Sequence, residues 1–407
     1  MKPLHYDPWL IPLGPLEALS QQIFQSLPPP RITPGRKPRA DAVARREAAL
    51  KSILANLAAL HLFPAPRSGV AMPLRNSKRT RYDRSGFTAD VLRRSIGDLE
   101  GAGLVDVSSG EFKQKRTTVS PSIALRGMMV VAGITLEAIG RDKGQETIEL
   151  WTRRQGRYGK ELIDYADTSE TVSMRTDLET INTVINGSRI RYEGVPLPPS
   201  AMVRKFTEDR SASTPTFAHH GRLYGGLWQS VPKELRYKLS LDGEPLVDLD
   251  YTAMFIQLAY AHLGAPMPKG DPYMIPGLEA YRSTVKKLVS SLFFRDGMAS
   301  RFPRDIDKLP PPWTMQKFVS AVAVRHKAIA SLLGSDIGFR LMYAESEVLV
   351  AVLLGLASQG VTALPMHDGL MVAQTHRSAA IAVMKQVSEV KLGRALSVVE
   401  KPILRPI

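Results

Sequence analysis

The sequence predicts an α+β protein in which a small helical module precedes a larger part built from short strands and helices. Three observations predict it. Apolar residues recur at helical spacing over 42–60, a second helix over 89–99 is followed by two short strand-like runs, and two later apolar strands each contain an aspartate. At about 150 residues per domain, 407 residues allow two to three domains.

The composition indicates a globular protein that interacts with polyanions. The chain is 44% hydrophobic and 23% charged, and its net charge is +15. Such a charge favours nucleic acid or an anionic membrane surface. The longest apolar stretches are too short to span a bilayer, and the N-terminus has no signal-peptide pattern, so we expect a cytoplasmic protein without a membrane partner. The absence of cysteine excludes disulfides, thiolate-bound metals and thiol nucleophiles.

Most of the positive charge lies near the N-terminus. Residues 31–96 contain 15 Lys and Arg against 4 acidic residues, a net charge of +11. One interpretation is a basic linker with solvated helix faces. The other is a surface that binds nucleic acid without reading its sequence.

The N-terminal pattern resembles a winged helix-turn-helix module. We expect a leader and basic linker over 1–40, followed by the module over 41–125. Asp41 is expected to cap the helix 42–60, and Thr88 the helix 89–99, which Gly101 and Gly103 end. Strand-like runs over 104–107 and 113–119 then form a hairpin. By this resemblance, DNA contacts come from the second helix and the wing, through Arg93, Arg94, Lys113, Lys115 and Arg116. The alternative is a simple packing unit of helices and a hairpin.

A mixed connecting segment over 126–213 is expected to be thumb-like. Within it, residues 147–151 are typical of a strand. Residues 176–186 predict a helix capped by Thr176 or Asp177.

Two aspartates in short apolar strands indicate a shared cation. Asp250 follows Leu246 and Val247, and Asp368 precedes Leu370. Burying an unpaired carboxylate costs several kcal/mol, so two such strands in a basic protein favour a metal site. Paired carboxylates that bind two Mg²⁺ ions are what phosphoryl transfer needs, and Mn²⁺ is an acceptable substitute. The alternative is two unrelated acids at strand ends.

Two cations lie one helical turn apart between these strands. Arg282 and Lys286 share one face of a predicted helix over 282–294, and Ser290 and Phe294 continue that face. This spacing matches the phosphates of a nucleoside triphosphate. The alternative is an exposed basic stripe.

In order and spacing, these elements resemble the palm and fingers of family A DNA polymerases and the related single-subunit phage and mitochondrial RNA polymerases. Gly221-Arg222-Leu223-Tyr224 stands where that family has an Arg-containing upstream element. Asp250-Tyr251-Thr252 is similar to its motif A, and His367-Asp368-Gly369 to its motif C. The resemblance covers residues 214–372 and implies a polymerase-like palm and fingers over 214–407, with further helices over 253–263, 312–333 and 339–359.

The resemblance also implies a role for each matching residue. Asp250 and Asp368 would hold the two metal ions, with Lys286 as a catalytic residue near the leaving pyrophosphate. The nucleotide would contact Arg282, Lys286, Phe294, Phe255 and Tyr251, and the primer or template would contact Arg222 and His367.

Three departures from the family pattern bear on the nucleotide. Gly369 replaces the acid that follows the catalytic aspartate in the DNA enzymes. Phe255 replaces a glutamate that excludes the ribose 2′-hydroxyl, and Phe294 replaces a tyrosine. The two phenylalanines favour deoxynucleotides or weak discrimination between the two sugars. We expect no proofreading, because the Asp-x-Glu triplets at Asp98 and Asp177 lie in predicted helices.

The sequence therefore predicts a template-directed nucleotidyltransferase that acts on a DNA template or primer–template with nucleoside triphosphates, and that works as a monomer. A small RNA polymerase or primase is the close alternative. A DNA-binding replication initiator or regulator with an inactive palm is the alternative of another class.

Overall fold

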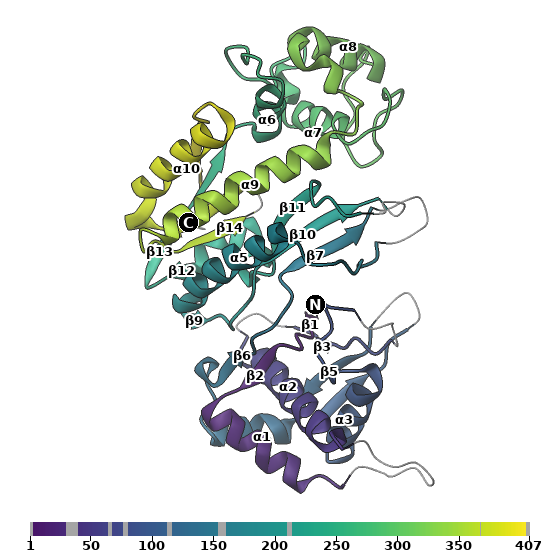
Figure 1. The fold of residues 1–407 in the computed structure, drawn as a ribbon, viewed down its shortest axis with the longest axis vertical. Coiled ribbons are helices and arrows are strands. Elements are labelled where there is room, and N and C mark those ends of the chain that lie inside the picture. Colours follow the sequence, from purple (N-terminus) through teal and green to yellow (C-terminus); the bar gives the residue numbers. More distant parts are fainter. Residues whose placement is uncertain are drawn as a thin grey trace. The chain divides into compact units, whose positions relative to one another are not determined.

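The computed structural model describes residues 3–29, 40–63, 67–75, 80–111, 116–153, 160–209, 214–366 and 368–403. The chain folds into two compact units (Figure 1). Unit 1 comprises Met1–Glu146, Arg189–Ala201 and Lys238–Gly243, and unit 2 comprises Thr147–Ser188, Met202–Tyr237 and Glu244–Ile407. Residues 126–213 thus contribute to both units.

Unit 1 is built around one long helix. Helix α2 (Ala42–Leu62) buries Leu50, Ile53, Leu54 and Leu57 almost completely, which confirms the predicted helical periodicity. The other helices of the unit are α1 (Gly14–Ser26), α3 (Ala89–Gly101), α4 (Ile123–Val131) and η1 (Leu136–Ala138). Its strands are β1 (Leu4–His5), β2 (Leu10–Pro12), β3 (Val70–Ala71), β4 (Val105–Ser108), β5 (Thr118–Pro121), β6 (Ile139–Arg141), β8 (Ile190–Tyr192), β9 (Val195–Pro196) and β12 (Leu239–Leu241).

The two predicted caps of these helices differ in outcome. Thr88 caps α3 as expected, because its hydroxyl oxygen accepts a hydrogen bond from the Val91 amide at 3.3 Å. Asp41 occupies the N-cap position of α2, but its side chain accepts no hydrogen bond from the helix backbone. Its carboxylate pairs with Arg45 one turn along the helix instead, so the predicted cap is wrong in its side-chain contact.

A hairpin follows α3, as the sequence predicts. Strands β4 and β5 pair antiparallel in a sheet of order β1-β3-β5-β4. The second strand was expected to begin at Lys113. Strand β5 begins at Thr118, and Lys113 and Lys115 lie outside the described residues. The assignment of this module as a winged helix stays a prediction.

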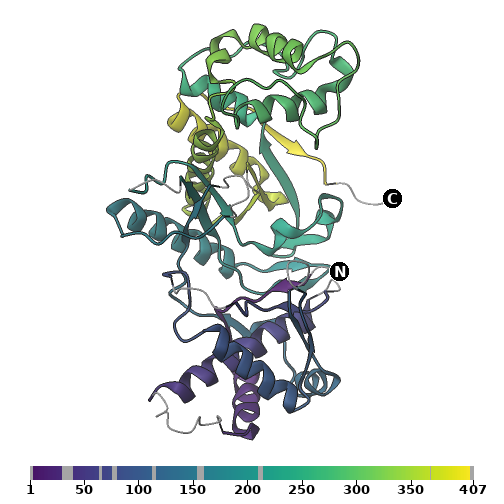
Figure 2. The same ribbon diagram turned by 90° about the vertical axis from the view of Figure 1, so that its right-hand side faces the viewer.

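Unit 2 contains the antiparallel sheet that was expected to carry both aspartates. Those of its strands that belong to unit 2 lie in the order β14-β15-β13, and β16 also pairs with β13. Figure 2 shows β16, in yellow, beside the long strand β13. The strand bounds are β13 (Glu244–Tyr251), β14 (Ala363–Met366), β15 (Gly369–Ala373) and β16 (Val398–Lys401).

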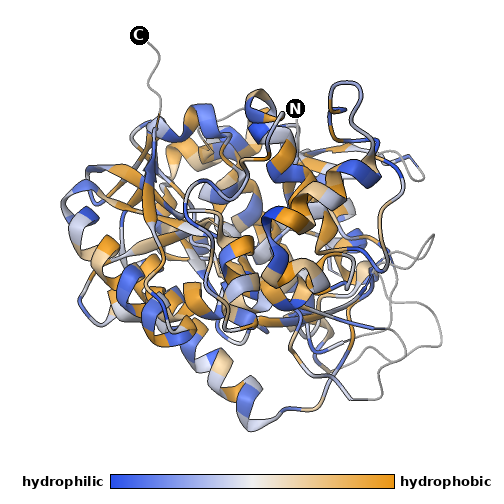
Figure 3. Cartoon of the chain, turned by 90° about the horizontal axis from the view of Figure 1, so that it is seen from above, coloured by the Kyte–Doolittle hydropathy of each residue, from blue (hydrophilic) through white to orange (hydrophobic). Residues whose placement is uncertain are grey.

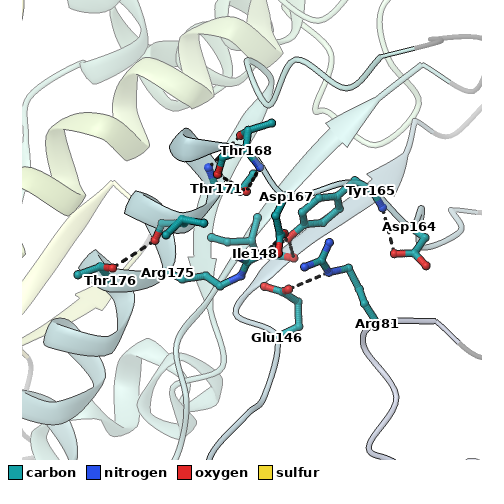
Figure 4. Close-up of polar contacts among 11 residues, drawn as sticks. Arg81, Glu146, Ile148, Asp164, Tyr165, Asp167, Thr168, Thr171, Arg175 and Thr176 are labelled. Carbon is teal, nitrogen blue, oxygen red and sulfur yellow. Dashed lines mark hydrogen bonds and ion pairs between the residues drawn. The ribbon is translucent and has the colours of Figure 1, made fainter.

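A second sheet of unit 2 has the order β11-β10-β7, and helix α9 packs along β11 (Figure 1). Strand β7 (Ile148–Thr152) confirms the predicted strand, and it pairs with β10 (Val203–Glu208), which pairs with β11 (His220–Tyr224). Helix α5 (Ser169–Gly187) begins earlier than expected. Thr168 and Thr171 form its capping box, and Thr176 lies inside the helix (Figure 4).

Unit 2 contains further helices, and hydrophilic and hydrophobic residues are interspersed along the helices of the chain (Figure 3). The predicted helix 312–333 is divided into α8 and the 3-10 segment η5. No helix among the described residues is long and apolar enough to cross a membrane. The bounds are η2 (Leu227–Ser230), η3 (Lys233–Lys238), α6 (Met254–His262), η4 (Glu279–Tyr281), α7 (Arg282–Leu292), α8 (Met315–Arg325), η5 (Lys327–Leu332), α9 (Gly338–Ala357), η6 (Gln374–His376) and α10 (Arg377–Leu392).

Candidate functional site

The two predicted aspartates come together in the β13–β15 pair. Asp250 lies near the end of β13 and pairs in register with Gly369, the first residue of β15. Asp368 directly precedes Gly369 in the turn between β14 and β15 and is half-buried. Asp250 is only 4% exposed. The register therefore places both carboxylates at one end of the sheet.

Gly369 permits the close approach of these two strands. A Cβ atom at this position would lie 2.3 Å from the backbone oxygen of Leu249 and 3.2 Å from Oδ1 of Asp250. Real Cβ atoms do not approach backbone oxygen this closely. The absence of an acid at position 369 thus has a packing cause in this chain.

The carboxylate of Asp250 is held in an unfavourable environment. Burial raises its pKa, and the nearby charge of Asp368 raises it further, while Lys401 and Lys286 act in the opposite direction. Its Oδ1 atom is buried and has no hydrogen-bond partner among the described residues. Its Oδ2 atom forms an ion pair with Lys401.

Lys401 is a site residue that sequence reasoning missed. Strand β16 pairs with β13 so that Lys401 lies opposite Asp248, two residues from Asp250 on the same face. The long side chain reaches Asp250 diagonally. Burial alone would lower the pKa of Lys401, but the contact with Asp250 raises it above its ordinary value. Asp248, which the sequence left without a role, accepts a hydrogen bond from Arg236 at 2.9 Å.

The two predicted phosphate-binding cations lie on α7, with Tyr273 beside them. The guanidinium of Arg282 is 5.5 Å from the ring centroid of Tyr273, and the ammonium of Lys286 is 6.0 Å from it. Burial raises the pKa of Tyr273 to about 12, an effect that Arg282 opposes and that Asp271, Asp368 and Asp250 reinforce. Tyr273 therefore lies beside both cations and near enough to Asp250 and Asp368 for their charges to act on its pKa, and no sequence pattern indicated this position.

Arg282 already has a partner in this structure. Its guanidinium pairs with both carboxylate oxygens of Asp271, which lowers the pKa of that carboxyl. Lys286 is exposed, and its charge acts on Asp250. Of the two cations, Lys286 is thus the one whose charge acts on Asp250.

A buried glutamate holds Arg222. The guanidinium of Arg222 donates to Oε2 of Glu345 at 2.5 Å and lies 5.7 Å from the ring centroid of Phe255. Glu345 lies on α9 and is 1% exposed. Its burial raises its pKa to about 7, although Arg222 opposes the effect. Burial tends to lower the pKa of Arg222, but Glu345 raises it.

Phe255 and Phe294, the two phenylalanines expected to contact the nucleotide, contact each other. The ring centroids of Phe255 and Phe294 are 5.6 Å apart, and Phe339 meets Phe294 edge-on at 5.4 Å. Tyr251 does not join them. Its hydroxyl donates to the Met384 carbonyl on α10 at 2.7 Å, and as a strand neighbour of Asp250 it faces the opposite side of the sheet. This placement does not support the nucleotide contact expected of Tyr251.

The remaining predicted residues lie in unit 1 or outside the described chain. Arg93 and Arg94 are exposed on α3, and Arg93 pairs with Asp90 one turn earlier. Arg116 is exposed just before β5. His367, like Lys113 and Lys115, lies outside the described residues.

The donor set fits Mg²⁺ better than a metal that needs a complete protein cage. Among the described residues, no group of three His, Cys, Asp or Glu side chains could hold a metal. Mg²⁺ is commonly bound by one or two carboxylates together with water and substrate phosphates. Asp250 and Asp368 supply such a pair, and the buried Oδ1 of Asp250 is an acceptor without a protein donor.

Comparison with known proteins gives little beyond this geometry. No family model matches the chain, and no curated protein matches it in sequence. Among solved structures, it is similar to the POL domain of Pol1 from M. smegmatis in complex with DNA primer-template and dNTP, at a TM-score of 0.30 and 12% identity. The match covers 96% of this chain and 66% of that chain. A likeness this weak carries no argument about function.

Proposed function

We propose that this chain is a template-directed nucleotidyltransferase that extends a nucleic-acid 3′-hydroxyl with nucleoside triphosphates. One observation carries the proposal. Asp250 and Asp368 meet at the end of a sheet, where Oδ1 of Asp250 is buried without a partner among the described residues and the charge of Lys286 acts on Asp250. Paired carboxylates with a triphosphate-binding cation are the requirement for two-metal phosphoryl transfer.

The residues would divide the chemistry among them. Asp250 and Asp368 would hold two Mg²⁺ ions, which polarise the attacking hydroxyl and stabilise the leaving oxygen when bound. Lys286 and Arg282 would orient the triphosphate and balance its charge. Tyr273, beside both cations, would help to hold their side chains in place.

The sugar of the nucleotide would be selected by the apolar surface of two phenylalanine rings. Phe255 and Phe294 are in contact and offer no hydrogen-bonding group to a 2′-hydroxyl. A site that buries a hydroxyl without a partner disfavours the nucleotide that carries it. The proposal therefore favours deoxynucleotides and DNA synthesis over RNA synthesis.

The other parts of the chain would position the nucleic acid. Arg222, fixed by Glu345, would contact the primer end or template. The N-terminal module would bind duplex phosphates through the exposed cations Arg93, Arg94 and Arg116, in the manner of a winged helix.

An incorporation assay tests the proposal. Primed and unprimed templates are incubated with Mg²⁺ and either dNTPs or NTPs, using wild-type protein, Asp250→Asn and Asp368→Asn. We expect primer extension with dNTPs by the wild type and a loss of at least about a hundredfold in each variant. Unprimed synthesis with NTPs would indicate a primase or RNA polymerase instead. Full activity in both variants would refute the proposed site.

One observation favours a second candidate, a DNA-binding initiator or regulator with an inactive palm. Lys401 already neutralises one oxygen of Asp250. If that ion pair is permanent, the site has no need of a metal. This candidate predicts DNA binding that Asp250→Asn does not alter and no incorporation with any nucleotide.

A further inference from the structure

Strand β16 brings a lysine to the proposed metal site from the C-terminal part of the chain. Lys401 forms an ion pair with Oδ2 of Asp250, while Oδ1 of the same carboxylate has no partner among the described residues. The side chain of Lys401 is 36% exposed, whereas that of Asp250 is 6% exposed. The ammonium thus approaches a buried carboxylate from the solvent side.

The position of this lysine follows from the strand register. Strand β16 pairs antiparallel with β13, with Val399 opposite Asp250 and Lys401 opposite Asp248. The Arg377–Glu400 ion pair and a 2.9 Å hydrogen bond from the Thr252 amide to the Ser397 carbonyl hold the strand. Backbone pairing therefore determines where the Cα atom of Lys401 lies, and the four-carbon side chain is the part that can change conformation.

A divalent cation and the ammonium would compete for Asp250. A buried carboxylate is costly unless a cation compensates it, and Lys401 supplies that compensation without a metal. Two cations on one carboxylate repel each other, so binding of the metal is opposed for as long as the ammonium stays. The lysine side chain can move toward solvent, whereas Asp250 on its central strand cannot.

We propose that Lys401 is an internal counter-ion that holds Asp250 in the metal-free protein and moves away when a divalent cation binds. Lys401 therefore sets the metal affinity of the site. It is a positioning residue, and this inference rests on the proposed function, because it takes Asp250 to be a metal ligand.

The test is binding of Mn²⁺ alone to the full chain, without nucleotide or DNA, followed by electron paramagnetic resonance at constant pH and ionic strength. Lys401→Met removes the charge and keeps the length of the side chain. Close, desolvated charge pairs couple by about tenfold or more in equilibrium terms. We therefore expect Lys401→Met to bind Mn²⁺ about tenfold more tightly than the wild type.

Three controls accompany this variant. Lys401→Arg keeps the charge and should bind Mn²⁺ as the wild type does. Lys385→Met removes an equal charge from the exposed face of α10 and should change nothing, which separates the ion pair from the general field of the protein. Asp250→Asn should abolish the binding. Thermal unfolding checks that each variant is folded, and Lys401→Gln replaces Lys401→Met if the latter is not.

The outcomes separate the two proposals. Equal or weaker Mn²⁺ binding by folded Lys401→Met overturns the role of Lys401 and leaves the proposed metal site standing if Asp250→Asn abolishes binding. Wild-type binding by Asp250→Asn overturns both. Tighter binding by Lys401→Met, without nucleotide incorporation by any form, supports the counter-ion and refutes the polymerase.

Discussion

The buried Glu345 makes the stability of unit 2 depend on pH in a way that one substitution should remove. Burial raises the pKa of Glu345 from 4.5 to about 7. The folded protein then binds this proton more tightly than the unfolded chain does. The free energy of unfolding should therefore fall as the pH rises from below 4.5 to above 7. The side chain introduced by Glu345→Gln cannot titrate, so this variant should lack the part of the pH dependence that comes from Glu345.

The magnitude follows from the two pKa values. Raising a pKa from 4.5 to about 7 corresponds to about 3.4 kcal/mol in full. At pH 5 the free energy of unfolding has already fallen by about 0.8 kcal/mol of this amount, and at pH 8 it has fallen by nearly all of it. The free energy of unfolding of the wild type should thus fall by about 2.5 kcal/mol more than that of Glu345→Gln between pH 5 and pH 8.

Urea unfolding at pH 5, 6, 7 and 8 measures this difference. Trp9 lies in unit 1 and the other three tryptophans lie in unit 2, so a Trp9→Phe background makes tryptophan fluorescence report on unit 2. Glu389→Gln, at an exposed position of α10, is the matched control and should follow the wild type. If the free energies of unfolding of the wild type and of Glu345→Gln changed with pH in parallel, the raised pKa of Glu345 would be refuted.

Three further predictions concern packing, DNA binding and sugar choice. Gly369→Ala should reduce the free energy of unfolding by about 1–3 kcal/mol, because the added Cβ meets the Leu249 carbonyl oxygen; an unchanged urea midpoint would contradict this. Arg94→Glu should weaken duplex binding equally for unrelated sequences and reduce the salt slope by about one, as measured by fluorescence anisotropy; a loss confined to one sequence would indicate base readout instead. Phe255→Ala should lower the preference for dNTPs over NTPs by about tenfold in primer extension; an unchanged ratio would exclude Phe255 from sugar selection.

The local features of the chain were predictable where they depend on neighbouring residues. The apolar spacing around Leu50 and Leu54 determines α2, and the Thr88 hydroxyl caps α3 because it needs only the next turn of backbone. The predicted start of α5 was wrong because two residues are acceptable caps. Thr176 and Thr168 are both acceptable caps, and only the reciprocal bond with Thr171 distinguishes them.

The partners of the site were not predictable in the same way. Asp250 and Asp368 each lie in a recognisable local motif, and a shared sheet end follows from pairing their strands. Glu345 is 123 residues from Arg222, and its ion pair depends on how α9 packs against β11. Tyr273 and Lys401 lie in segments with no motif, and their roles arise only from tertiary contacts.

The same contacts explain how this site keeps its carboxylate pair without an acid at position 369. The Cβ atom of an acid at position 369 would collide with the Leu249 carbonyl oxygen. The acid would also add negative charge beside Asp250, and the pKa of Asp250 is already raised by burial and by Asp368. Glycine avoids both costs. Lys401, on the neighbouring strand β16, compensates the negative charge of Asp250 through its ion pair. In a site arranged in this way, Lys401 compensates the buried carboxylate in the absence of a metal. Its activity would then depend on whether a divalent cation can displace one lysine side chain, and Mn²⁺ binding by the Lys401 variants measures that competition directly.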